Sequence, residues 1–460
     1  MADALTDLLA DPELEVMSVV TCDFNGFARG KFVTPARLEG SAPMRLSNIL
    51  TMMDYSGMPY SPPEGDDRWW PSWAEGYTDT RAVVDPNTAR QVPWQLNTGL
   101  VVADLERADG QGLLEFLPRT TLKRLIARLA DHGLTAKVAQ ELEFMTFQET
   151  QASAVAKGFR DLVPLWSLPA AYSLTAAGRN EPVLRTLRDH LEGFGLPIDT
   201  WGVEGGPGQI EMNLPPEDAL TASDQAFLFK HAIKEITSSI GLYASFVPKL
   251  ATLGFGNGNH LNLSLWEGQK NAFFDPDNPD KLSDICRHFV GGIVNTLREM
   301  TLCYAPTPLS YRRFIPYFST GMQACWGIDN KSVGVRVVTE SENLARIEQR
   351  TAGADANPYI LTAACLAAGL YGIENQVEPP PAVQADAYAD PKVPMVPTNI
   401  NEALDLFEAS QVANDYLGED FVRFYAHGRR IEAAAFAEAA AGTEGAEVTD
   451  WELHRYFDIS

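Results

Sequence analysis

Short runs of β-branched and aromatic residues, separated by turn residues, fill the first hundred positions of the chain. Residues 16–33 contain two such runs on either side of Asn25-Gly26, a dipeptide typical of hairpin turns. Two more strand-like runs follow at 81–94 and 98–105. Residues 56–76 are rich in Pro, Gly and Trp, and a loop of this length often has a functional role or forms an interface. Its tryptophans are Trp69, Trp70 and Trp73.

From about residue 118 the hydrophobic pattern alternates between helical and strand periods. Helical patterns cover 119–133, 181–195, 222–246 and 357–375. Strand patterns cover 137–147, 208–214, 260–266, 332–338 and 345–350. We therefore expect an α+β fold, with a small N-terminal β domain at 1–110 and a large domain at 111–460. The Pro-rich residues 378–397 predict a surface excursion before an Ala-rich helical tail.

The composition of the 460 residues is that of a globular protein, with 45% hydrophobic and 21% charged residues. The formal net charge of −25, without any Lys/Arg block, argues against binding to nucleic acid or to an anionic membrane. The sequence contains neither a secretory signal nor an apolar run of about 18 residues that would span a membrane. We expect a cytoplasmic protein whose five well-separated cysteines are reduced and mostly buried.

Carboxylates on the predicted strands are the most informative candidate groups. The chain has neither a Walker loop nor a convincing dinucleotide motif, so any nucleotide must be held in another way. Glu141 and Glu143 are two residues apart in an otherwise apolar strand, so both side chains project from one face. Neighbouring carboxylates repel each other unless a cation holds them. Solvated acids on an edge strand are the alternative interpretation of this pair.

Four more candidate groups lie further along the chain. Glu204 and Glu211 flank a Gly-Gly-Pro-Gly turn, and Glu211 lies in an otherwise uncharged strand. His260 begins an alternating strand, where a single histidine is more often structural than a ligand. Glu348 shares its strand face with the arginines two residues before and after it, which alone indicates an ion-pair ladder.

Together, these five carboxylates and one imidazole form an oxygen-rich donor set that suits Mg²⁺ or Mn²⁺ better than Zn²⁺. Five cations can neutralise a transferring phosphate and a substrate carboxylate: Arg313, Lys331, Arg336, Arg346 and Arg350. A metal site with arginines and no Walker loop indicates phosphoryl transfer onto a carboxylate.

Several motifs, in one order over nearly the whole chain, resemble those of the glutamine synthetase family. They are QELEF at 140–144, GPGQIE at 206–211, the turn ending in His260, SYRRF at 310–314, NKSVGVR at 330–336, and RIEQR with ANPY at 346–359. The resemblance implies an N-terminal β-grasp domain and a catalytic domain with a curved antiparallel sheet. It also implies a homo-oligomer of two stacked rings, in which a neighbouring subunit's N-terminal domain completes each site.

The resemblance also implies roles for individual residues. One metal site falls on Glu143, Glu204 and Glu211, and the other on Glu141, His260 and Glu348. The substrate-binding positions are Arg313, Arg350, Gly256, Phe255 and Ser319, and the nucleotide positions are Arg336, Arg346, Ser264 and Asn262. The catalytic cations are Arg313, Lys331 and Arg336. The implied reaction uses ATP and Mg²⁺ or Mn²⁺ to phosphorylate the γ-carboxylate of glutamate, after which an amine displaces phosphate.

The sequence departs from ammonia-using members of the family where the amine is expected to enter. Their glutamate after the SYRRF-type motif is Ser319 here, and a serine neither attracts ammonium nor acts as a base near neutral pH. Asn262 replaces a histidine, Phe255 an asparagine and Lys331 an arginine. Asp54 is the nearest candidate for the acidic group that those members contribute from the N-terminal domain.

We therefore expect a γ-glutamylamide synthetase that joins glutamate to an organic amine, with small alkyl or aromatic amines favoured over polyamines. An apolar amine pocket would be lined by Phe255, Tyr317 and Phe318, with Trp69 or Trp70 as further candidates. One alternative is an ammonium-using glutamine synthetase. Another is a catalytically silent family member that acts as a binding protein, although all six metal ligands are present. A different acyl substrate is a third, because Phe255 stands where the family contacts the α-amino end of glutamate.

Overall fold

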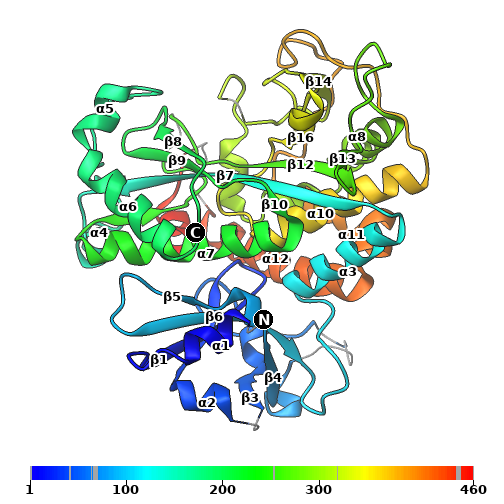
Figure 1. The fold of residues 1–460 in the computed structure, drawn as a ribbon. Coiled ribbons are helices and arrows are strands. Elements are labelled where there is room, and N and C mark those ends of the chain that lie inside the picture. The colour runs from blue at the N-terminus through cyan, green and yellow to red at the C-terminus, as the bar shows by residue number, and fades with distance from the viewer. Residues whose placement is uncertain are drawn as a thin grey trace.

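The computed structural model describes residues 3–40, 43–63, 65, 71–251, 254–318, 320–441 and 447–458. A small sheet of N-terminal strands lies below a larger sheet in Figure 1, and helices pass between the two. The five cysteines are free and buried, as predicted. The architecture is the α+β fold that the hydrophobic pattern predicts.

The small sheet has the strand order β2-β1-β6-β4-β3, with β5 paired to β6. The hairpin predicted at Asn25-Gly26 is confirmed, and Gly26 adopts a φ of +85° that glycine tolerates best. β1 also pairs in parallel with β6, which brings the first and last strands of this sheet together. The elements are α1 (Ala4–Leu9), β1 (Val16–Cys22), β2 (Ala28–Val33), α2 (Pro35–Glu39), β3 (Met44–Ser47), β4 (Asp79–Val84), β5 (Arg90–Gln91) and β6 (Thr98–Glu106).

The large sheet has the order β14-β15-β16-β12-β7-β9-β8, and its pairs are antiparallel except β14 with β15. Its strands are β7 (Thr135–Phe147), β8 (Thr200–Val203), β9 (Gln209–Asn213), β10 (Glu217–Asp218), β11 (Tyr243–Ser245), β12 (Asn259–Glu267), β13 (Lys270–Asn271), β14 (Trp326–Ile328), β15 (Val335–Val338) and β16 (Arg346–Gln349). The helices are α3 (Pro118–Asp131), α4 (Gln151–Ala156), α5 (Leu174–Arg179), α6 (Glu181–Gly193), α7 (Ala219–Ser239), α8 (Asp284–Thr296), α9 (Thr301–Tyr304), α10 (Pro358–Glu374), α11 (Ile400–Ala409), α12 (Glu419–Ala439) and α13 (Asp450–Tyr456).

The two faces of β7 explain how the large sheet is packed. Val138, Leu142 and Phe144 are fully buried, and the Phe144 ring lies 6.1 Å from that of Phe229 on α7. Figure 1 shows α7 and α10 on this side of the sheet. Because side chains alternate along a strand, the residues between these apolar positions face away from the helices. That opposite face is therefore available for polar groups.

The two longest helices at which the structure corrects the sequence analysis are α7 and α8. The helix predicted over 222–246 ends at Ser239, and residues 243–245 form strand β11 instead. Gly241 explains the break, because its φ of +75° is a conformation that ends helices. Helix α8 (Asp284–Thr296) was not predicted at all.

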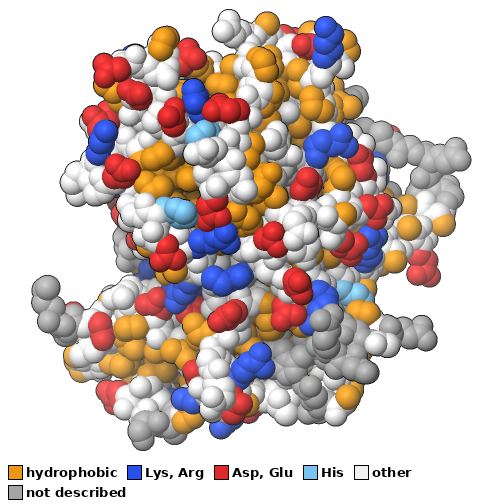
Figure 2. Space-filling view, turned by 90° about the vertical axis from the view of Figure 1, so that its right-hand side faces the viewer, with side chains coloured by type: hydrophobic (Ala, Val, Ile, Leu, Met, Phe, Trp, Pro, Cys, Tyr) orange, Lys and Arg blue, Asp and Glu red, His pale blue; other side chains and the backbone are white. Residues whose placement is uncertain are grey.

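The remaining expectations have mixed outcomes. Residues 378–397 contain neither helix nor strand, as predicted for a surface excursion. The boundary near residue 110 lies between β6 and α3 and remains a prediction. Within the described ranges, the helices are too short or too polar to cross a bilayer. On the face in Figure 2, acidic and basic side chains of the described residues are interspersed.

Candidate active site

Two cavities on the polar face of the large sheet share Glu141 as a common wall. The acidic cavity, of about 450 Å³, is lined by all six predicted metal ligands. The second cavity, of about 610 Å³, is lined by the predicted nucleotide residues Asn262, Ser264 and Arg346. Three of the four expected nucleotide positions thus lie in a compartment beside the expected metal ligands, and the fourth, Arg336, lines the acidic cavity itself.

Strand register brings the acidic residues together. His260 on β12 lies opposite Glu141 on β7, and Glu211 on β9 lies opposite Glu143 on β7. β16 pairs with the other edge of β12 and carries Glu348 to the same face. Because side chains on one face repeat every second residue, this register gathers groups as far apart in the chain as Glu141 and Glu348, which are 207 positions apart.

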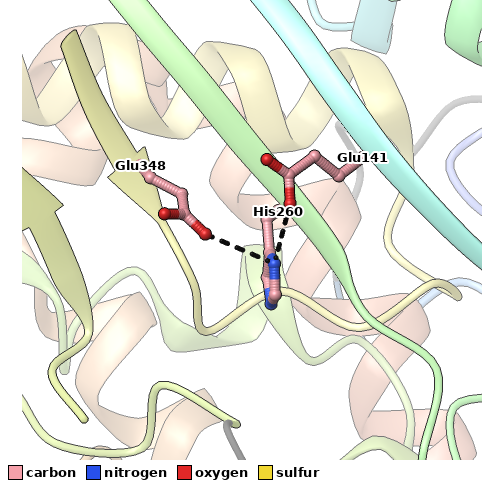
Figure 3. Close-up of side chains that lie close together, drawn as sticks. All are labelled: Glu141, His260 and Glu348. Atoms are coloured by element: carbon pink, nitrogen blue, oxygen red, sulfur yellow. Dashed lines mark hydrogen bonds and ion pairs between the residues drawn. The ribbon is translucent and has the colours of Figure 1, made fainter. Parts of the chain in front are cut away.

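Glu141, His260 and Glu348 form a compact triad (Figure 3). Nδ1 of His260 lies 3.2 Å from a carboxylate oxygen of Glu141 and 3.5 Å from one of Glu348. The candidate ligand atoms of the triad all lie within 4.8 Å of one another. Asn262 donates a 2.8 Å hydrogen bond to Glu141. Glu348 accepts hydrogen bonds from Arg336, at 2.8 Å, and from Arg350.

The second predicted metal group, Glu143, Glu204 and Glu211, lines the same cavity beside the triad. Its carboxylates are less tightly gathered than the triad, which is the one such compact group within the described part of the chain. Glu143 accepts a hydrogen bond from the backbone N–H of Gly258 at 2.8 Å and one from the amide of Gln209 at 3.0 Å. Both contacts fix its carboxylate toward the glycine-rich turn.

The acidity of these carboxyl groups differs between the two clusters. Burial raises the pKa values of Glu143, Glu204 and Glu211, and a neighbouring carboxylate raises each of them further. Burial also acts to raise the pKa of Glu141, but hydrogen bonding to His260 and its positive charge lower it to about 2. The glutamates outside the triad thus crowd negative charge that His260, Arg313 and Lys331 offset only in part.

The donor set and its charge fit a divalent cation. Five carboxylates and one imidazole provide mostly hard oxygen ligands, which Mg²⁺ and Mn²⁺ prefer. A bound cation would stabilise the ionised carboxylates that now repel one another. The cavity residues therefore match the metal class expected from the sequence.

Four of the predicted cations also line the acidic cavity: Arg313, Lys331, Arg336 and Arg350. Arg313 ends a 3₁₀ turn, is only 2% exposed, and donates to the Thr351 carbonyl at 3.0 Å. Arg336 donates hydrogen bonds to two carboxylates. One goes to Glu348, and the other runs from its Nε to Asp329 at 3.0 Å. Lys331 is exposed at the cavity rim. Arg346 instead lies at the second cavity.

Two glycines allow the backbone to approach these groups closely. A Cβ at Gly256 would lie 2.5 Å from the Pro248 carbonyl oxygen and 2.8 Å from Cγ of Arg313, so a larger residue does not fit. A Cβ at Gly205 would lie 2.5 Å from the Phe255 ring. Phe255 therefore packs directly against the backbone beside Glu204, at the edge of the metal-ligand cluster.

The second cavity contains two residues that the sequence analysis missed. Trp266 follows Asn262 and Ser264 at the same two-residue spacing on β12, and its indole N–H donates to the Ser264 hydroxyl at 2.9 Å. Nζ of Lys137 lies 3.9 Å from the centre of the Trp266 ring. The alternation from His260 to Trp266 was the available signal for this residue. Arg346 donates to the Asn262 side chain at 2.9 Å.

Aromatic side chains occupy the side of the acidic cavity where the amine was expected. Phe255 and Phe318 meet edge to face with their ring centres 5.6 Å apart, and Tyr317 lies beside them. Tyr172, which the sequence analysis missed, also lines this cavity and is exposed, with a φ of +58°.

Other predicted positions lie elsewhere. Ser319, Trp69 and Trp70 fall outside the described residues. Asp54 does not line either cavity: it accepts a 3.0 Å hydrogen bond from Arg455 and caps its own turn. Its predicted contribution to a neighbouring subunit's site remains a prediction.

Comparison with known proteins gives a consistent family relationship. A sequence profile described as the catalytic domain of glutamine synthetase matches residues 115–456. A γ-glutamylethanolamide synthetase of Streptomyces coelicolor is 39% identical over 389 residues, covering 84% of this chain and 81% of that protein. A glutamate–isopropylamine ligase of a Pseudomonas species is 31% identical over 462 residues, covering 98% and 97%.

Proteins named for other activities are also similar. A type-1 glutamine synthetase of Dictyostelium discoideum is 32% identical over 451 residues, covering 96% of this chain and 84% of that protein.

Among solved structures, one described as apo GmaS without ligand has a TM-score of 0.82 and 26% identity, with 99% of both chains covered.

Proposed function

This chain belongs to the glutamine synthetase family, and on that premise we propose that it joins the γ-carboxylate of glutamate to a small organic amine at the expense of ATP. The observation that carries the proposal is the pair of cavities that meet at Glu141. A nucleotide in the second cavity would have its terminal phosphate at the entrance to the acidic cavity. That is the geometry needed to transfer the phosphate to a carboxylate held there.

Each compartment has groups for its half of this first step. Asn262, Ser264 and Arg346 would hold the nucleotide, and the Trp266 ring offers a flat surface next to them. In the acidic cavity, the buried Arg313 and the Glu348-bound Arg350 would bind the carboxylates of glutamate. Arg336 and Lys331 would neutralise charge on the transferring phosphate.

The six candidate metal ligands would hold Mg²⁺ or Mn²⁺, which supplies charge neutralisation around the phosphate oxygens. The protein's own part is to keep those ligands in place. Arg336 and Arg350 fix Glu348, Asn262 fixes Glu141, and the Gly258 N–H fixes Glu143. Such supporting contacts keep a site at its working geometry.

In the second step the amine nitrogen attacks the γ-carbonyl carbon of γ-glutamyl phosphate. The new C–N bond forms as the C–O bond to phosphate breaks, and phosphate leaves with that electron pair while the nitrogen loses a proton. Phe255, Phe318 and Tyr317 would form an apolar wall for the carbon chain of the amine. An apolar wall favours a neutral organic amine over ammonium.

The relatives support an organic amine but leave a second candidate. The proteins from Streptomyces and Pseudomonas are named for ethanolamine and isopropylamine products or substrates. The Dictyostelium relative is named as a glutamine synthetase, and this observation favours ammonium as the alternative substrate. The two candidates differ in the second step only, because both activate glutamate with ATP.

A product assay separates them. Phosphate release from ATP is measured with Mg²⁺ and glutamate against ammonium, ethanolamine, isopropylamine, larger alkylamines, anilines, diamines and polyamines, with mass spectrometry of each product. We expect a γ-glutamylamide from a small primary amine and little glutamine. Glutamine as the main product would establish the ammonium alternative. The absence of turnover with every amine would favour another acyl substrate or a binding role.

We also propose that the protein assembles as two stacked rings, with each site completed by the N-terminal domain of a neighbour. The division into an N-terminal domain at 1–110 and a catalytic domain at 111–460 is part of this proposal. Light scattering after size-exclusion chromatography, followed by electron microscopy, tests it. A fully active monomer would contradict both the ring assembly and the shared site.

A further inference from the structure

The Pro-rich strap, residues 378–397, is tied closely to the edge of the large sheet. Figure 1 shows it as the orange loop beside β14. The side chain of Asn330 donates to the carbonyls of Val383, at 3.0 Å, and Ala385, at 2.8 Å. The Gln323 side chain donates to the Ala387 carbonyl at 2.8 Å. These contacts fix the middle of the strap although it has no regular secondary structure.

The strap carries an aromatic side chain to the rim of the acidic cavity. The Tyr388 ring is half-buried, and its centre lies 5.1 Å from that of Tyr317 at an interplanar angle of 52°. Burial raises the pKa of Tyr388, while the positive charge of Arg350 partly opposes the shift. The positive charge of Arg350, an expected glutamate-binding residue, therefore acts on Tyr388.

Asp386, two residues before Tyr388, adds a negative charge to this part of the strap. Its carboxylate accepts a 2.9 Å hydrogen bond from the backbone N–H of Tyr388, which shapes the turn. The negative charge of Asp386 raises the pKa of the Tyr317 phenol. The strap thus contacts Tyr317 through the Tyr388 ring and also acts on it through the charge of Asp386.

Tyr317 needs such support. It has a φ of +68°, in the left-handed region that favours glycine, and its side chain is 69% exposed. Burial therefore does little to hold the ring in place. The Tyr388 ring supplies a contact, and Asp386 a charge, next to this exposed side chain.

We propose that Tyr388 is a positioning residue that holds Tyr317 at the rim of the acidic cavity, and that this pair limits the bulk of the amine that can enter. The inference rests on the proposed function and narrows it to primary amines with a short, uncharged chain. Phe255 and Phe318 line the same cavity and pack against each other. A strap tied at several points cannot move aside easily for a larger group.

The test compares amines with one another in the holoenzyme. Tyr388→Ala removes the ring that supports Tyr317, and Tyr388→Phe keeps it. For each variant, kcat/KM is measured for a small amine such as ethanolamine and a bulky one such as benzylamine. The compared quantity is kcat/KM for the bulky amine divided by kcat/KM for the small amine, called the bulky-to-small ratio. We expect Tyr388→Ala to raise this ratio about tenfold and Tyr388→Phe to leave it near the wild-type value. A merely structural role would lower both values together and leave the ratio unchanged.

Two aspartates on the strap provide a second, matched comparison. Asp386 and Asp390 each accept a 2.9 Å hydrogen bond from the backbone N–H two residues later, and both are exposed. Asparagine preserves this turn contact and removes the charge. We expect Asp386→Asn to raise the bulky-to-small ratio and Asp390→Asn not to change it.

The outcomes separate this inference from the proposed function. If the wild-type enzyme makes γ-glutamylamides but neither Tyr388→Ala nor Asp386→Asn changes the ratio, the positioning role is wrong and the function stands. If the wild-type enzyme makes only glutamine, the organic-amine function fails first, and the size limit fails with it.

Discussion

The two sides of the acidic cavity are built in different ways. On the metal side, Glu141 and Glu143 stand on β7 and Glu348 stands on β16, with β12 between the two strands, and backbone pairing sets their spacing. On the amine side, Phe255 and Tyr317 come from loops and are 43% and 69% exposed. Groups on a sheet are held accurately, whereas loops tolerate change. This contrast predicts that phosphate chemistry is the fixed part of the reaction and amine choice the adjustable part.

The largest effect is expected from breaking the metal side at its centre. Glu348 is 1% exposed and accepts hydrogen bonds from Arg336 and Arg350, so Glu348→Gln disturbs a metal ligand and both cations together. We expect kcat to fall by more than about a hundredfold, with every amine affected alike. Steady-state phosphate release measures it.

Glu267→Gln is the matched control for this change. Glu267 lies exposed at the end of β12 and lines neither cavity. Its activity should equal that of the wild-type enzyme. Wild-type activity in the Glu348→Gln enzyme would mean that the triad is not central to the reaction.

Truncating the aromatic wall should affect the amine side alone. Phe255→Ala removes the ring that packs on Gly205 and meets Phe318. We expect the KM for the amine to rise about tenfold while the KM for ATP changes less than about twofold. Initial rates with each substrate varied in turn provide the measurement. Equal changes in the KM values for the amine and for ATP would mean that the metal side and the amine side do not act independently.

Relieving charge repulsion should stabilise the metal-free protein. Burial raises the pKa of Glu211, and the negative charge of Glu141 raises it further, so the ionised side chain opposes folding in the absence of metal. Glu211→Gln should raise the stability of the metal-free protein by about 1 kcal/mol and weaken Mn²⁺ binding. Thermal unfolding with chelator, and Mn²⁺ titration by calorimetry, test the two parts. A variant that is less stable without metal would be the opposite of this expectation.

The smallest expected effect is a pH dependence of the folding stability, caused by Lys249 next to the amine side of the cavity. Lys249 is 1% exposed, donates to the Gly254 carbonyl, and has Nζ 5.3 Å from the centre of the Phe318 ring. Burial, with the positive charge of Arg313, lowers the pKa of Lys249 from its ordinary 10.5 to about 8. Below pH 8 the lysine is charged in both the folded and unfolded chains, so the cost of burying that charge is fully present. This cost disappears as the pH rises from the folded to the unfolded pKa.

The stability of the wild-type protein should therefore rise relative to Lys249→Met between about pH 8 and pH 10. Denaturant unfolding of both proteins across this range measures the difference. A constant difference would mean that Lys249 does not lose its proton in the folded state within this window.

Much of the metal side could be predicted because it follows the strand period. Glu141 and Glu143 are two residues apart, and so are His260, Asn262 and Ser264, which places each set on one face before any tertiary contact is known. The same rule would have found Trp266. The boundary between α7 and β11 was missed because Gly241 lies within a pattern that is otherwise compatible with a continuous helix.

The sequence by itself determined the α+β class, most of the strands, the donor chemistry and the family, because periodicity and short motifs are local properties of the chain. Only the tertiary structure decided that Glu141 is shared by two cavities, that Phe255 packs on Gly205, and that Tyr388 reaches Tyr317. The last two contacts join loops that are far apart in the chain. Loop positions depend on long-range packing and hydrogen bonds rather than on a repeating pattern, so no local signal encodes them.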